Sequence, residues 1–215
     1  MSPLLLLLAL AGEPAETQRR DSDYGQPVRT PETMADMAMM RAAACAMGKS
    51  QPAARRVLET GIGSKEENDR VKTLRGLARD CFPLQWAELP ATPVRNALAE
   101  ITYRRDYKAL PPSAEATAPA SFAVVPAGTN GTPQQEATWQ LAAVARCAVF
   151  AGGAEAHAFV DGPHNVPEET RRFEALKPAL GKCIAADQVA ALTPRLMRGP
   201  VATALLARAT AAEKK

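Results

Sequence analysis

The spacing of the four cysteines constrains the fold of this chain more than any other feature. Cys45 and Cys81 lie 36 positions apart, and so do Cys147 and Cys183. A shift of 102 positions, from Cys45 to Cys147, lays the first pair over the second without a gap. The same shift aligns several more residues: Ala54 with Ala156, Glu66-Glu67 with Glu168-Glu169, Arg70 with Arg172, and Leu74 with Leu176. The sequence therefore predicts two homologous units in tandem.

Each unit reads as a set of short helices, and the expected fold is all-α. Apolar residues recur at helical spacing, and alanine, the strongest helix former, is abundant. The expected helices cover about 34–48, 52–59, 64–81 and 93–103 in the first unit, and about 134–151, 154–160, 167–183 and 200–210 in the second. A buried stripe in the third helix is expected to hold Val71, Leu74, Leu77, Ala78 and Cys81. Beyond the second cysteine, a small insertion is expected to pair Pro93-Val94 with Pro200-Val201.

The third helix carries the acidic pair of each repeat. Ser64 followed by Glu67 forms a capping-box pattern, in which the two side chains satisfy free backbone N–H groups. Negative charge is favourable at a helix start, so the pair needs no catalytic role in this interpretation.

Four cysteines allow three disulfide pairings, and the repeat favours Cys45–Cys81 with Cys147–Cys183. Each unit is then closed by its own bridge, which is worth up to about 4 kcal/mol for a loop of about 37 residues. The chain lacks the C-x-x-C motif of thioredoxin-like redox sites and the closely spaced cysteine pairs of four-cysteine zinc sites. The cysteines are therefore expected to be structural.

The first residues read as an export signal. Leu4 to Ala11 is an apolar run of eight residues, too short to cross a bilayer, and Ala9-Leu10-Ala11 resembles a cleavage site. The expected organisation is a signal peptide over 1–11, a flexible N-terminus over 12–31, helical unit 1 over 32–108, a Pro/Ala-rich linker over 109–133 and helical unit 2 over 134–215. Export and paired cysteines together predict a periplasmic or secreted bacterial protein.

Candidate functional residues are few. His157, Asp161 and His164 are the only cluster of metal-ligand types; they are interpreted as surface residues and remain weak candidates for a metal site. A relaxed phosphate-loop pattern over 43–50 is interpreted as a helix end, because the second unit lacks its lysine. No catalytic residue and no cofactor site is expected. The net charge of +3 is spread over a mixed surface, which does not favour nucleic acid.

The segment from Cys45 to Tyr103, with its echo from Cys147 to Arg208, resembles a group of uncharacterised exported proteins from alphaproteobacteria. These carry a C…A…L…G/S-E-E…L…C block followed by a short helix, often in tandem. The resemblance implies a duplicated, exported helical protein and adds no active-site residue.

Two functions are expected from the sequence. The first is a non-catalytic binding or structural module for an unknown protein or cell-envelope partner, without a transmembrane helix. The alternative is a periplasmic enzyme whose site forms between the units. A deep pocket holding acids or histidines with shifted pKa values favours the enzyme, and a shallow apolar groove favours the binding module.

Overall fold

The computed structural model describes residues 30–83, 90–109, 131–164 and 167–213. All regular structure within these ranges is helical, as the sequence predicts, and they contain no strand. The expected signal peptide, nearly all of the expected flexible N-terminus and most of the expected linker lie outside the described residues.

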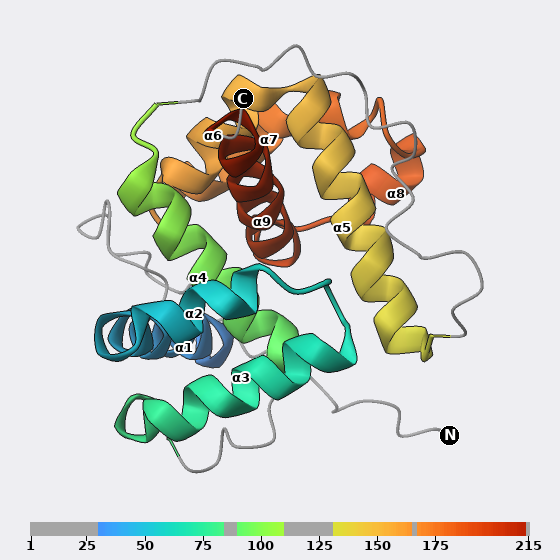
Figure 1. Ribbon diagram of the computed structural model, residues 1–215. Coiled ribbons are helices and arrows are strands. Elements are labelled where there is room, and N and C mark those ends of the chain that lie inside the picture. The colour runs from blue at the N-terminus through green and yellow to red at the C-terminus, as the bar shows by residue number, and fades with distance from the viewer. Residues whose placement is uncertain (1–29, 84–89, 110–130, 165–166, 214–215) are drawn as a thin grey trace, which may run out of the picture.

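The helices form two groups in space that follow the order of the chain (Figure 1). The first group comprises α1 (Pro31–Lys49), α2 (Gln51–Leu58), α3 (Lys65–Leu77), the short 3-10 helix η1 (Arg79–Cys81) and α4 (Ala91–Asp106). The second comprises α5 (Pro133–Ala151), α6 (Gly153–Asp161), α7 (Pro167–Leu180), α8 (Ala186–Ala191) and α9 (Pro194–Glu213). In Figure 1 the first group lies below and the second above, with α4 and α9 side by side where the groups meet.

The long first helices of the two units start in the same way. Both α1 and α5 have 19 residues, begin with proline and are preceded by a threonine N-cap. The hydroxyl of Thr30 accepts from the Thr33 N–H, and that of Thr132 accepts from the Gln135 N–H, each at 3.3 Å. The side chains at these third positions return the hydrogen bond, which completes a capping box in each unit. The same local chemistry therefore starts both units.

Both predicted disulfides are confirmed. The bridge Cys45–Cys81 has its Cα atoms 5.6 Å apart, and Cys147–Cys183 has them 5.9 Å apart. In the first unit the prediction that Leu77 belongs to the buried stripe is wrong, because that side chain is 61% exposed. The reason is that α3 ends at Leu77, and the 3-10 helix that follows turns Cys81 back toward α1.

The two units pack against each other and share part of a core. One apolar cluster consists of first-unit residues, whereas the cluster of the second unit also contains Ala99 and Tyr103 from α4. Helix α9 approaches α4 closely at Gly199, where an added Cβ would lie 2.6 Å from the Cβ of Asn96. The Thr203 hydroxyl donates to the side-chain oxygen of Asn96 across this contact, at 3.1 Å. The pair α4 and α9 therefore forms the largest contact between the units.

Two buried arginines correct the expected alignment of the fourth helices. Arg95 on α4 and Arg198 on α9 both donate to carbonyl oxygens at the end of the second helix of their own unit. The acceptors are Val57, Leu58 and Thr60 for Arg95, and their counterparts Phe159, Val160 and Gly162 for Arg198. The helices thus correspond with a shift of 103 positions, from Arg95 to Arg198. The predicted pairing of Pro93 with Pro200 is wrong, because Pro200 lies inside α9 and does not start it.

Candidate functional site between the two units

A buried ion network joins the two units. The Nε of Arg198 donates to Oε1 of Glu100 on α4, and its Nη1 donates to Oε1 of Glu169 on α7, each at 3.0 Å. All three side chains are buried. The guanidinium also donates to four backbone carbonyls of the second unit: Phe159, Val160, Gly162 and Pro163. This degree of hydrogen bonding is what a buried charge needs to offset its loss of hydration.

His164 extends the network to the edge of a cavity. Its Nε2 lies 2.6 Å from Oε1 of Glu100, and Arg104 lies 3.6 Å from the same oxygen. Burial alone would raise the pKa of Glu100, but the hydrogen bond from His164 and the charge of Arg198 outweigh it. The pKa of Glu100 is therefore lowered, and this carboxylate is ionised at neutral pH.

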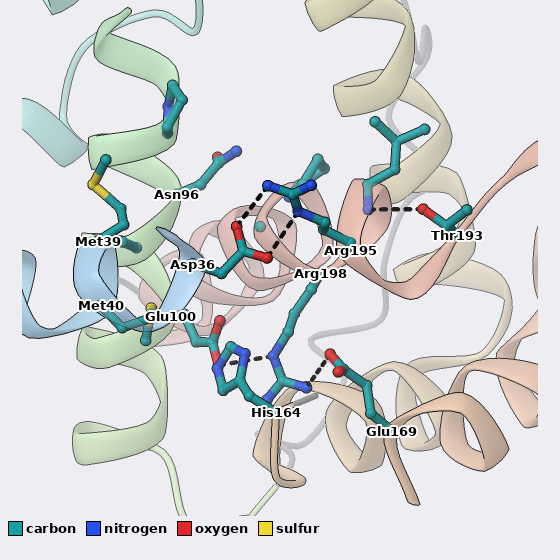
Figure 2. Close-up of a pocket in the computed structure, with 15 residues that line it drawn as sticks. Asp36, Met39, Met40, Asn96, Glu100, His164, Glu169, Thr193, Arg195 and Arg198 are labelled. Atoms are coloured by element: carbon teal, nitrogen blue, oxygen red, sulfur yellow. Dashed lines mark hydrogen bonds and ion pairs between the residues drawn. The ribbon is translucent and has the colours of Figure 1, made fainter. Parts of the chain in front are cut away.

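The cavity beside this network has a volume of about 490 Å³ and is lined by both units. Its apolar wall is formed by Met39, Met40, Pro93, Ala97 and Leu196. Figure 2 shows Glu100, His164, Arg198 and Glu169 together on one side of it, with Asp36 and Arg195 facing each other from α1 and α9. The last two form a partly exposed ion pair at 2.8 Å, which is a further link between the units.

The polar groups of this network are already engaged with one another. Oε1 of Glu100 lies close to three cationic or donor side chains, and Arg198 donates to carboxylates and carbonyls together. A molecule in the cavity would therefore meet apolar side chains and the edge of His164, whose side chain is 23% exposed. It would also meet the polar side chains of Asn96 and Thr193 and the Asp36–Arg195 ion pair. This combination of apolar walls and a few polar groups is typical of reversible small-molecule sites.

The structure separates the three metal candidates of the sequence. His164 bonds Glu100, whereas Nδ1 of His157 lies 2.8 Å from the hydroxyl of Tyr103 on α4. Asp161 is exposed, as interpreted, but both histidines are only partly exposed and bind residues of the first unit. Among the residues that the structure describes, no group of three or more His, Cys, Asp or Glu side chains is placed to hold a metal ion. The histidines therefore serve the interface here.

Sequence reasoning missed the residues at the centre of the network. Aligning V-R-N-A over 94–97 with M-R-G-P over 197–200 would have paired Arg95 with Arg198, but the prolines suggested another register. Glu100 has no counterpart in the second unit, where Thr203 occupies its position, so the repeat carries no signal for it. The repeat aligns Glu66-Glu67 with Glu168-Glu169, and the second glutamate of each pair is buried in the structure. Favourable charge at a helix start does not explain why these two side chains are buried.

No protein-family model, curated protein or solved structure matches this chain. Within the described ranges, no helix has both the length and the apolar character needed to cross a membrane.

Proposed function

We propose that this chain is an exported, non-catalytic binding protein that holds a small molecule in the cavity between its two units. The observation that carries this proposal is the cavity itself, with walls from α1, α4 and α9. Its volume of about 490 Å³ lies within the usual range of small-molecule pockets. Because each unit supplies part of the lining, a tandem arrangement is what creates the site.

Export is part of the same proposal. The two disulfides indicate an oxidising environment, since such bonds persist outside the reducing cytosol. The apolar run before Gly12 supports a cleaved signal, and together they support a periplasmic or secreted location in a bacterium. The matching caps, disulfides and buried arginines support the origin of the two units by duplication, as the resemblance to tandem alphaproteobacterial proteins implies.

An enzyme with its site between the units is the second candidate, and the contact between His164 and Glu100 favours it. A histidine beside a carboxylate in a cavity is a common acid–base arrangement. Its weakness is electrostatic: the same contacts that lower the pKa of Glu100 make that carboxylate a poor base near neutral pH. Binding without turnover therefore agrees better with the geometry.

The proposal is tested by blocking the cavity. Leu196 lines it and is 43% exposed, so Leu196→Trp fills the opening with little risk to the fold. Leu77→Trp is the matched control, because Leu77 is also exposed but does not line the cavity. A library of soluble small molecules is screened by ligand-observed NMR against the oxidised protein.

We expect at least one compound to bind the wild type and Leu77→Trp equally, and to bind Leu196→Trp at least tenfold more weakly. Compounds that bind all three proteins alike, or a library without any binder, count against the proposal. Chemical conversion of a bound compound that is lost in His164→Gln would favour the enzyme instead.

A further inference from the structure

The two units meet through contacts in which corresponding residues exchange roles. The Thr203 hydroxyl of α9 donates to Asn96 of α4. The shift of 103 positions turns this pair into Glu100 and Gly199, and both of these line the cavity beside the ion network. Asn96 and Gly199 are also counterparts of each other, and they lie in close contact. Such an exchange is typical of an interface with approximate two-fold symmetry, in which each site between the units occurs twice.

One site between the units is filled by Tyr103 of α4. Its side chain is fully buried in the apolar cluster of the second unit, and its hydroxyl lies 2.8 Å from Nδ1 of His157 on α6. Its ring stacks on that of Tyr107, with the ring centroids 5.6 Å apart. Burial, and then the negative charge of Asp161, raise the pKa of the Tyr103 hydroxyl to about 12. A neutral phenol with its hydroxyl directed at α6 therefore occupies this site.

The second occurrence of this site is a cavity. The counterparts of Tyr103, His157 and Asp161 are, in this order, Leu206, Arg55 and Glu59. All three counterparts line a second cavity between the units, with a volume of about 820 Å³. Leu58 also lines it and packs against the apolar clusters of both units, so α2 approaches the second unit here as α6 approaches the first.

Two aromatic rings are replaced by shorter side chains on this side of the interface. Leu206 stands in the place of Tyr103, and Thr210 stands in the place of Tyr107. Both replacements line the cavity. The space that a tyrosine ring fills on one side is therefore open on the other.

The polar edge of the second cavity can bind a hydroxyl group. Arg55 and Glu59 line the cavity and are both exposed, so a ligand can reach them. The hydrogen bond from Arg105 is the main cause of the lowered pKa of Asp106, and the charge of Arg55 adds to it, so the Arg55 guanidinium lies near this cavity residue. A guanidinium donates and a carboxylate accepts, so the two together match the oxygen and the proton of one hydroxyl.

We propose that this second cavity binds a small phenol, whose ring takes the place that Tyr103 holds on the other side of the interface. The ring lies against the apolar and aromatic wall formed by Leu58, Leu206 and Tyr107. The phenol hydroxyl accepts from Arg55 and donates to Glu59. A tyrosine side chain in a peptide carries the same group, so the experiment also includes a peptide. This inference does not depend on the first cavity.

The probe is 4-ethylphenol, titrated into the full oxidised chain by calorimetry. The comparison ligands are 4-ethylanisole, which lacks the hydroxyl proton, 4-ethylcyclohexanol, which lacks the aromatic ring, and the tripeptide Gly-Tyr-Gly. Leu206→Tyr supplies the missing ring from within the chain, and Ala207→Trp blocks the cavity from an exposed position. Leu196→Trp, which fills the other cavity, is the control. Arg55→Met removes the donor to the hydroxyl.

We expect 4-ethylphenol to bind at a 1:1 ratio and all three comparison ligands to bind at least tenfold more weakly. Leu206→Tyr and Ala207→Trp should each weaken 4-ethylphenol at least tenfold, while Leu196→Trp leaves its affinity unchanged. Arg55→Met should weaken 4-ethylphenol but not 4-ethylanisole.

The proposal is overturned if millimolar 4-ethylphenol does not bind, or if any comparison ligand binds as tightly. Equal effects of Ala207→Trp and Leu196→Trp would also overturn it, as would a folded Leu206→Tyr chain with wild-type affinity. If Leu206→Tyr does not fold, the comparison of the two tryptophan variants decides.

Discussion

Replacing Arg198 by methionine removes the charge that links the two units while keeping most of the side-chain length. Glu100 and Glu169 then stay buried without their shared cation. Breaking a buried ion pair by removing one partner typically costs about 3–5 kcal/mol, and here the carbonyls at the end of α6 lose their donor as well. We therefore expect the free energy of unfolding to fall by at least about 3 kcal/mol, a large share of the stability of an ordinary domain.

Arg95→Met is the matched comparison, because Arg95 donates to the equivalent carbonyls but has no ion pair with a described carboxylate. Its loss should cost about 1–3 kcal/mol, the typical effect of leaving buried acceptors unsatisfied. Glu100→Gln combined with Arg198→Met should recover part of the loss, since one of the two stranded carboxylate charges is gone. Urea denaturation at pH 7, followed by circular dichroism with the disulfides intact, measures all of these variants. A cost below about 1 kcal/mol for Arg198→Met, or an equal cost for Arg95→Met, would refute the reasoning.

Three further predictions concern pH, covalent closure and export. Burial raises the pKa of Glu67, so the protonated side chain favours the folded state and this contribution to stability is lost as pH rises. The resistance of Glu67→Gln to urea should therefore increase, relative to the wild type, between pH 4 and pH 8. The pKa of Glu100 is lowered, so Glu100→Gln should lose more stability at pH 7 than at pH 3. If the stability of both variants relative to the wild type changed in the same direction with pH, the opposite pKa shifts of Glu67 and Glu100 would be contradicted. Cys81→Ala should lower the free energy of unfolding by about 2–4 kcal/mol, and peptide mapping should find Cys147–Cys183 still oxidised; mixed pairing would contradict two self-closed units. Mass spectrometry of protein from its native host should find the mature N-terminus at or near Gly12, whereas a product that retains Met1 would argue against export.

The helices and disulfides were predictable because their causes are local or repeated. Apolar spacing indicates a helix within one segment, and equal cysteine spacing in two copies selects one pairing out of three. The exposed Leu77 shows the limit of this reasoning. Helical periodicity predicts that the buried stripe continues to Cys81, but α3 ends at Leu77 and a 3-10 helix follows it.

The interface could not be predicted in the same way. The contact of Glu100 with Arg198 joins residues of different units, and neither helical periodicity nor the repeat encodes it. Its partner His164 lies in a loop, where no spacing rule applies. Pro200 lies inside α9, although proline more often marks a helix start. The sequence therefore predicted the wrong alignment between the fourth helices of the two units.

The central claim is that a small molecule binds between the two units, and methionine methyl groups report on it directly. Met39 and Met40 line the cavity, whereas Met34 is an exposed residue of the same helix. The measurement is a methyl NMR spectrum of ¹³C-methionine-labelled, oxidised protein, titrated with the low-molecular-weight fraction of the host cell envelope. Our account predicts that the Met39 and Met40 resonances shift while Met34 does not, and that Leu196→Trp abolishes the shifts. Unchanged resonances in every fraction, or shifts that persist in Leu196→Trp, would contradict it.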